Sequence, residues 1–166
     1  MGKAPYLFYG PNDAEASSQY FDGTRKNVVL VPGTSLGAKN YPADRFVTVC
    51  DALKENILVC HGNDQELETA RYIAERCKSV TVLPRLTLNQ LKAAVSRADL
   101  VIGGDTGPTH IAWANNVPVI ALFGPTPVCT FASPISRIVV PPGGVGRPMH
   151  EIDEAVILRH AEELLS

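Results

Sequence analysis

GGDTGPTHIAWANNVPVIALFGPT, residues 103–126, holds two glycine-containing turns with a helical stretch between them. The apolar run before it, 99–102, is typical of a buried strand, and 118–123 is a second such run. Glycines permit the first tight turn, Asp105 or Thr106 caps the helix that follows, and a proline fits its first turn. Free N–H groups and about half a positive charge at this helix N-terminus predict a phosphate site.

Strand-length apolar runs alternate with helical patterns along the rest of the chain. This alternation is typical of β-α-β units and predicts an α/β fold, a Rossmann-like three-layer sandwich with a mainly parallel sheet of about six strands. We expect a linker segment at 1–27 and one domain at 28–166. The expected strands are 28–31, 57–60, 80–83, 99–102, 118–123 and 137–140, and the expected helices are 14–20, 42–54, 64–77, 88–96 and 153–165.

Composition narrows the class of protein. The chain has 166 residues, 45% of them hydrophobic, which suffices for one domain with a sizeable core. A net charge of -2 argues against non-specific nucleic-acid binding, so no nucleic-acid partner is expected. No apolar run has membrane-spanning length and no signal-peptide pattern is visible, so a soluble intracellular protein is expected. The cysteines are widely spaced in apolar contexts, which favours buried free thiols: Cys50, Cys60, Cys77 and Cys129.

Ligands of parallel sheets bind outside the carboxyl ends of the strands, where four loops of this chain are expected to converge. The first loop, 32–39, offers the hydroxyls of Thr34 and Ser35 and the mobile cation of Lys39 to a phosphate. The alternative is an ordinary loop with a surface lysine, because the spacing is not that of a Walker A sequence.

The second and third loops have acidic and apolar character. Asp64 and Glu66 follow a strand, where a carboxylate accepts from a ribose hydroxyl. Alternatively they only complement the helix N-terminus, and Glu66 is suited to both roles. In 84–87, the backbone and Leu86 are placed to meet a flat base, and the alternative is a plain connection capped by Thr87.

The fourth loop is the opening stretch itself. A diphosphate repels Asp105 unless the charge is screened, so Asp105 is expected to face a cap N–H or a sugar hydroxyl. The main-chain N–H groups of Thr106 and Gly107 then remain for phosphate. His110 lies in the first helical turn and is placed to donate to a phosphate or sugar oxygen, with a purely structural hydrogen bond as the alternative. Trp113 is expected in the core.

Reactive constellations are absent from the sequence. There is no Gly-x-Ser-x-Gly elbow, no cluster of His and carboxylates at metal spacing, and no Cys beside an evident base. The chain is therefore equipped to hold a nucleotide more clearly than to react with it.

Two stretches resemble a known family. PGTSLGAK (32–39) with YPADRF (41–46) resembles the donor-domain loop of the lipopolysaccharide heptosyltransferases, glycosyltransferase family 9. GDTGPTH (104–110) with PVIALFGPT (118–126) is similar to the second and most distinctive motif of that family. The resemblance implies one half of a GT-B fold, in which two Rossmann-like halves enclose the active site. It also implies that 28–166 binds a nucleotide sugar, typically ADP-L-glycero-β-D-manno-heptose, without a metal or other cofactor.

Carried over by position, the resemblance assigns a contact to each loop. It puts Thr34, Ser35 and Lys39 at the diphosphate and Glu66 at the ribose. Arg85 and Leu86 fall at the adenine. Phosphate and sugar oxygens fall to the residues of the fourth loop: Asp105, Thr106, Gly107 and His110.

Two departures from the family pattern matter. The amino-terminal half, which carries the acceptor site and the general-base aspartate, is absent, and PPGGVGRP (141–148) replaces a cysteine-rich segment. We therefore expect the donor-binding half of an inverting glycosyltransferase of lipopolysaccharide inner-core biosynthesis, as an isolated domain or a truncated product. Alone it is expected to be inactive, with Lys39 as a phosphate stabiliser and no catalytic base. The complete protein is expected in the cytoplasm at the inner face of the bacterial inner membrane, where its missing half meets a lipid-linked acceptor.

Two alternatives belong to other functional classes. One is a non-catalytic nucleotide-sugar-binding module or subunit that borrows its other half from a second chain. The other is a sugar-nucleotide epimerase or hydrolase domain on the same scaffold.

Overall fold

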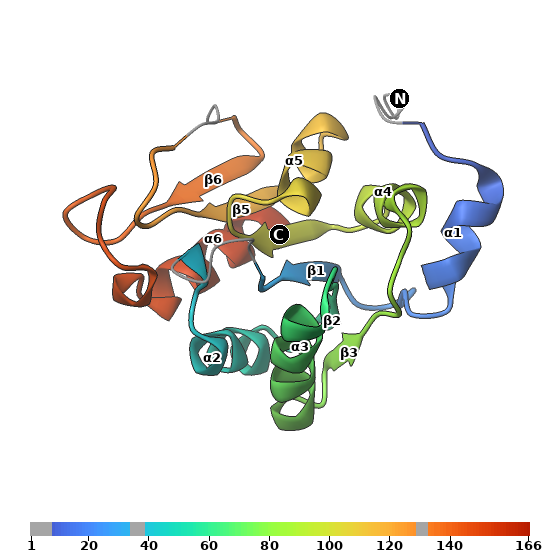
Figure 1. The fold of residues 1–166 in the computed structure, drawn as a ribbon, viewed down its shortest axis with the longest axis horizontal. Helices are drawn as coiled ribbons and strands as arrows, with labels where there is room; N and C mark the ends of the chain where they lie inside the picture. The colour runs from blue at the N-terminus through green and yellow to red at the C-terminus, as the bar shows by residue number, and fades with distance from the viewer. Residues whose placement is uncertain (1–7, 34–38, 129–132) are drawn as a thin grey trace.

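The computed structural model describes residues 8–33, 39–128 and 133–166. Within these residues lies a six-stranded sheet of order β3-β2-β1-β4-β5-β6, in which every neighbouring pair is parallel (Figure 1). The order reverses between β1 and β4, as in doubly wound dinucleotide-binding folds, and the predicted Rossmann-like α/β fold is confirmed. The strands are β1 (Asn27–Val31), β2 (Asn56–Val59), β3 (Val80–Val82), β4 (Leu100–Gly103), β5 (Val119–Leu122) and β6 (Ser136–Val139).

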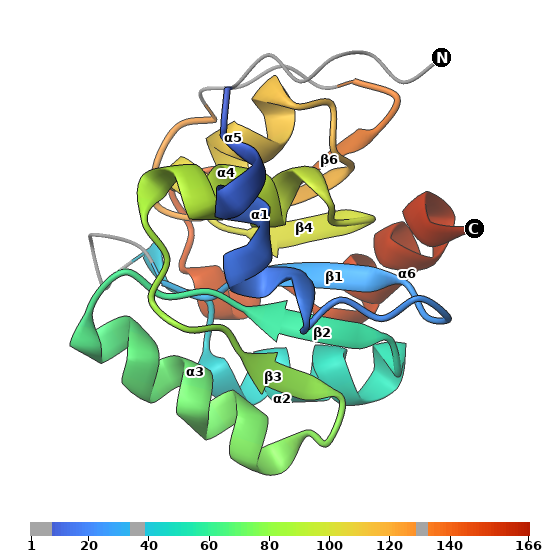
Figure 2. The ribbon, with the colours of Figure 1, turned by 90° about the vertical axis from the view of Figure 1, so that its right-hand side faces the viewer.

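Helices cover both faces of the sheet and complete three layers (Figure 1). One face packs against α2 (Ala43–Leu53), α3 (Asp64–Arg76) and α6 (Glu154–Leu165), which the short 3-10 helix η2 (Met149–Glu151) precedes. The other face packs against α4 (Leu88–Ser96) and α5 (Gly107–Ala114). The remaining helix, α1 (Pro11–Ser18), lies on α4 (Figure 2).

β1 shows why the strands have continuous apolar sequences. Val28 and Leu30 belong to the core on the α2 side, whereas Val29 and Val31 belong to the core on the α5 side. Successive side chains of a strand point to opposite faces, and here both faces are covered. All five residues of β1 are consequently buried, although Asn27 is polar.

Helix α1 begins earlier than the sequence predicts, at Pro11 instead of residue 14. A proline fits the first helical position because its missing N–H needs no partner there. The Asp13 carboxylate accepts from the Gly10 N–H at 2.7 Å and holds this helix start. The Ser96 hydroxyl donates to the Tyr9 hydroxyl at 2.8 Å, so this leading part of the chain is attached to α4.

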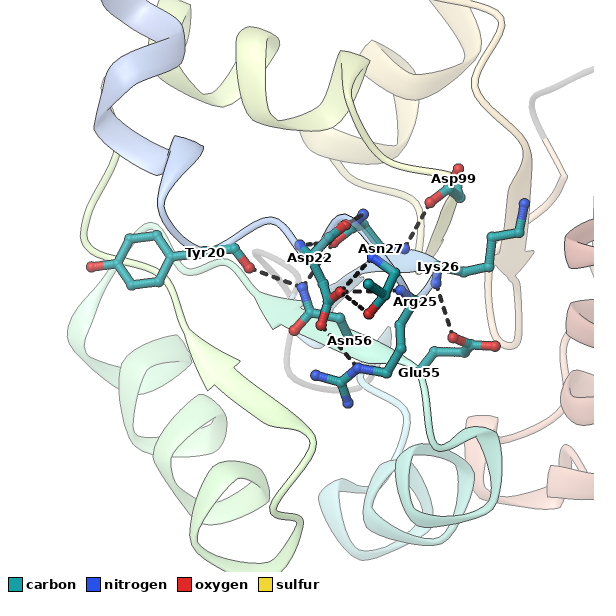
Figure 3. Close-up of polar contacts among 9 residues, drawn as sticks. Tyr20, Asp22, Arg25, Lys26, Asn27, Glu55, Asn56 and Asp99 are labelled. Carbon is teal, nitrogen blue, oxygen red and sulfur yellow. Dashed lines mark hydrogen bonds and ion pairs between the residues drawn. The ribbon is translucent and has the colours of Figure 1, made fainter.

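The amino ends of β1, β2 and β4 are joined by a polar network (Figure 3). The Asn27 side-chain oxygen accepts from the Asp22 N–H at 2.7 Å and from the Asn56 amide at 2.8 Å, and the Asn27 N–H donates to Asp99 at 2.7 Å. The Asn56 amide also donates to the Tyr20 carbonyl at 2.9 Å. These polar groups satisfy one another within the protein, whereas the opposite edge of the sheet contains the candidate site described below.

Three cysteines among the described residues are buried free thiols, as predicted: Cys50, Cys60 and Cys77. Cys129 lies outside the described residues. Burial raises the pKa of the Cys50 and Cys60 thiols to about 12. Burial likewise raises the pKa of Tyr41, whose hydroxyl donates to the Ile152 carbonyl at 3.0 Å, to about 12.

These buried acids predict an alkaline loss of stability. In the unfolded chain Cys50 and Cys60 lose their protons near pH 9, whereas the folded protein keeps them to about pH 12. The unfolded state therefore binds fewer protons in this interval, and the free energy of unfolding is expected to fall by about 1 kcal/mol per pH unit for each thiol. Urea unfolding at a series of pH values measures the slope. Cys50→Ala should flatten it, and an unchanged slope would contradict the assignment.

Candidate functional site

A cavity of about 320 Å³ opens at the carboxyl ends of the central strands, and we call it the carboxyl-end cavity. This volume falls within the range of small-molecule sites, and the position is where ligands of doubly wound sheets bind. Loops that follow β1, β2 and β4 form most of it, together with residues around the start of α4. Its lining residues are Val31, Gly33, Cys60, His61, Gly62, Glu66, Leu86, Leu91, Asp105, Thr106, Gly107 and Pro108.

The structure brings most of the predicted site residues to this cavity. Five of them line it: Glu66, Leu86, Asp105, Thr106 and Gly107. Lys39 and His110 do not line it but contact Asp105 at its rim. Arg85 is exposed and is not among the lining residues. Thr34 and Ser35 lie outside the described residues.

The start of α5 forms one side of the cavity. Thr106 occupies the N-cap position, but its hydroxyl lies 3.3 Å from that of Thr109 and makes no capping bond to the helix backbone. The side chain of Thr106 therefore leaves the first N–H groups of α5 to another acceptor. Pro108 lies in the first turn, as predicted, and the positive end of the helix dipole faces the cavity.

The Asp105 carboxylate contacts the side chains of His110 and Lys39. One carboxylate oxygen lies 2.9 Å from His110 Nε2, and the other lies 4.0 Å from Lys39 Nζ. The Lys39 and Asp105 side chains are each only about one-fifth exposed, 20% and 21%. The cation of Lys39 screens the repulsion that Asp105 would exert on an anion, and a phosphate site beside Asp105 requires such screening.

The β2–α3 turn forms the opposite side. Asn63 caps α3, and its side-chain oxygen accepts from the Glu66 N–H at 2.9 Å. The Glu66 carboxylate folds back and accepts from the Gly62 N–H at 2.6 Å and from the Asn63 amide at 3.1 Å. The structural role that the sequence left open for Glu66 is therefore present, and the carboxylate still lines the cavity.

Apolar groups make up the wall between these two sides. Leu86 and Leu91 line it and are half-buried against the core of the α5 side. Thr87 caps α4, as the sequence allowed, and accepts from the Gln90 N–H at 3.3 Å. His61 Nε2 lies 3.0 Å from the Leu83 carbonyl oxygen and ties the β2–α3 turn to the end of β3.

Cys60 is a neutral thiol within this wall. Burial, followed by the charge of Glu66, raises its pKa to about 12, so it is protonated at neutral pH. It therefore offers the cavity a small apolar surface and not a nucleophile.

Several lining residues were not predicted as site residues from the sequence: Val31, Cys60, Leu91 and Pro108. Val31 and Cys60 end or follow buried strands, and Leu91 belongs to the inner face of a helix. Their apolar character predicts burial. Because a cavity wall has the same apolar sequence pattern as a core, the sequence does not distinguish the two. Trp113 is a core residue, as predicted, and its indole donates to the Ser136 hydroxyl at 3.1 Å.

The described residues contain no group of three or more His, Cys, Asp and Glu side chains that could hold a metal ion. In the part of the chain that the structure describes, no helix combines the length and hydropathy needed to cross a membrane. The arrangement supplies hydrogen-bond donors, a cation and an apolar wall, which together can bind an anionic ligand with a flat apolar group.

Comparison with known proteins identifies relatives. A sequence model of glycosyltransferase family 9 (heptosyltransferase) matches residues 3–144. Lipopolysaccharide heptosyltransferase 1 of Campylobacter coli is 32% identical over 126 residues, which cover 69% of this chain and 37% of that protein. Lipopolysaccharide core heptosyltransferase OpsX of Haemophilus influenzae is 30% identical over 123 residues, which cover 70% and 35%.

Solved structures show the same fold. E. coli heptosyltransferase WaaC with ADP-2-deoxy-2-fluoro heptose superposes with a TM-score of 0.75 at 22% identity, covering 90% of this chain and 47% of that one. A glycosyltransferase family 9 protein from Veillonella parvula gives a TM-score of 0.78 at 22% identity, covering 96% and 53%. The chain thus spans about half of these solved chains and just over a third of the curated relatives.

Proposed function

Because the chain belongs to glycosyltransferase family 9, the heptosyltransferases, we propose that it is the donor-binding part of an inverting glycosyltransferase of lipopolysaccharide inner-core biosynthesis. The donor is an ADP-heptose-type nucleotide sugar. The observation that carries the proposal is the carboxyl-end cavity, which combines a helix N-terminus, a screened carboxylate and an apolar wall at the point where strand order reverses. WaaC, a relative in fold, has been solved with ADP and with an ADP-heptose analogue.

Each part of the cavity has a role in this proposal. The Thr106 and Gly107 N–H groups and Lys39 hold the diphosphate, with Thr34 and Ser35 from the preceding loop. His110 donates to a phosphate or sugar oxygen, and Asp105 accepts from a sugar hydroxyl. Glu66 meets the ribose, Leu86 packs on the adenine and Arg85 lies beside it. No metal is needed, because the helix N-terminus and Lys39 supply the positive charge.

The reaction forms a bond between an acceptor hydroxyl oxygen and the anomeric carbon, and it breaks the bond from that carbon to the diphosphate. This part of the protein stabilises the negative charge that develops on the departing diphosphate, the electrostatic share of catalysis. The acceptor proton goes to a base in an amino-terminal half. We therefore propose that this chain alone is inactive and that the complete protein works in the cytoplasm, at the inner face of the inner membrane.

Titration of the purified chain with ADP, UDP and GDP tests the proposal. We expect ADP to bind about tenfold more tightly than UDP or GDP, because the wall around Leu86 and its neighbouring backbone select one base. Magnesium is expected to change the affinity less than twofold. Isothermal titration calorimetry with and without the metal measures both. Tighter UDP binding, or a strict need for metal, would contradict the assignment.

Mixing experiments separate the two other functional classes. A donor-binding part should regain heptose transfer when an amino-terminal half is added, whereas a plain binding module should not. A hydrolase or epimerase would release free nucleotide from the sugar nucleotide without any acceptor.

A further inference from the structure

The carboxylate of Glu66 is held in one place by three neighbours. It accepts from the Gly62 N–H at 2.6 Å and from the Asn63 side-chain amide at 3.1 Å. The third neighbour is Gly33, near the start of the loop after β1, which has no side chain and so leaves room for that of Glu66. A Cβ on Gly33 would lie 2.3 Å from Glu66 Cγ and 2.9 Å from its Oε1. The absence of a side chain at Gly33 is therefore what admits Glu66 to this position.

Asn63 does more than cap a helix. Its oxygen accepts from the Glu66 N–H at 2.9 Å, which satisfies one of the free donors of α3. Its amide nitrogen donates to the Glu66 carboxylate at 3.1 Å. An aspartate would perform the first function equally well, but it has no donor for the second, which the side-chain amide supplies. Asn63 thus serves both the start of α3 and the Glu66 carboxylate.

A carboxylate held in this way retains capacity to bind a ligand. Its two oxygens offer about four lone-pair sites, and the Gly62 and Asn63 donors occupy two. Glu66 lines the carboxyl-end cavity just beyond β2, where an acidic residue of a dinucleotide-binding fold accepts from ribose hydroxyls. Ordering a free glutamate on binding costs side-chain entropy, and a prior clamp removes that cost.

We propose that Gly33 and Asn63 are positioning residues, which hold Glu66 ready to accept from the ribose hydroxyls of the bound nucleotide. The inference rests on the proposed function, since it concerns the ribose of the same ligand. It adds that selection of ribose over deoxyribose depends on residues from two different loops, and that neither Gly33 nor Asn63 needs to touch the nucleotide.

The test compares ADP with 2′-deoxy-ADP, in wild type and variants, by calorimetric titration. Wild type is expected to prefer ADP by about tenfold, the usual gain from a hydrogen bond to a charged group. Glu66→Gln, Gly33→Ala and Asn63→Asp should each reduce the preference to about threefold or less, with the affinity for 2′-deoxy-ADP within about twofold of wild type. Asn63→Asp keeps the capping oxygen, so α3 remains capped. The aspartate has no donor for the Glu66 carboxylate and repels it.

Matched controls separate this effect from general disturbance of the fold. Gly23→Ala introduces a Cβ that meets no atom within 4 Å, and Asp153→Asn alters the cap of α6, whose residues do not line the cavity. Both should keep the wild-type preference, and thermal melting should show every variant folded.

The outcomes are distinguishable. If Gly33→Ala and Asn63→Asp keep the wild-type preference, or weaken both nucleotides equally, the positioning role is wrong. A wild type that binds ADP without preferring it to 2′-deoxy-ADP overturns this inference alone. A wild type that does not bind ADP overturns the proposed function and this inference together.

Discussion

Gly103→Ala is expected to lower the free energy of unfolding by about 3 kcal/mol and the thermal midpoint by about 10 °C. A Cβ at this position would lie 2.7 Å from the Val31 Cβ, 3.0 Å from Thr109 Oγ1 and 3.1 Å from the Val31 carbonyl oxygen. Val31 and Gly103 are register partners in β1 and β4, so the contact cannot be relieved by rotating a flexible side chain. One strand must move away from the other.

The same displacement should damage ligand binding, because β1 and β4 end at the carboxyl-end cavity, where Val31 and Asp105 are lining residues. We expect at least a tenfold loss of ADP affinity, measured beside the urea and thermal unfolding curves. Gly107→Ala is the matched control for stability, since its Cβ would meet no atom within 4 Å. Equal stability of the two variants would show that β1 and β4 do not approach as closely as described.

Lys39→Ala is expected to weaken ADP binding by about 30-fold with little change in the thermal midpoint. Lys39 lies 4.0 Å from Asp105 at the rim of the cavity, partly exposed, and makes little contribution to the core. Its removal takes a cation from the diphosphate and also leaves Asp105 less screened, so both effects disfavour the anion. Calorimetric titration with ADP, paired with thermal melting, measures the change.

His110→Ala is the companion variant and Lys54→Ala the control. His110 is half-exposed and contacts Asp105 and the Trp113 ring, so its loss is expected to weaken ADP binding by a smaller factor, about fivefold. Lys54 is an exposed lysine at the end of α2 and does not line the cavity. Wild-type affinity in Lys39→Ala would exclude Lys39 from the diphosphate site. A large fall in the melting temperature would instead assign Lys39 or His110 a structural role.

Helix and strand positions were predictable because local chemistry dictates them. β5 is an apolar run between a helix and a glycine, and α3 follows Asn63, whose side chain caps it. Such features act over a few residues and can be recognised in the amino-acid sequence. The early start of α1 was missed because Pro11 and Asp13 stabilise a helix start in a stretch without apolar periodicity.

The candidate site was predictable at the level of loops but not of contacts. That the turns after β1, β2 and β4 meet follows from the parallel sheet, because all carboxyl ends lie at one edge. That Leu86 lines the cavity, whereas Arg85 is exposed and does not line it, could not be inferred, since the two are neighbours in a loop without regular periodicity.

Alternating apolar runs and turn residues were enough to predict the α/β class, the parallel sheet and the edge at which the cavity opens, because each depends on short-range periodicity and topology. Folding alone decided that Glu66 lies over Gly33 and that Lys39 faces Asp105. These partners come from different loops, and their meeting depends on strand order and on how closely the loops pack. No local sequence pattern predicts these contacts, so they can be recognised only in the tertiary structure.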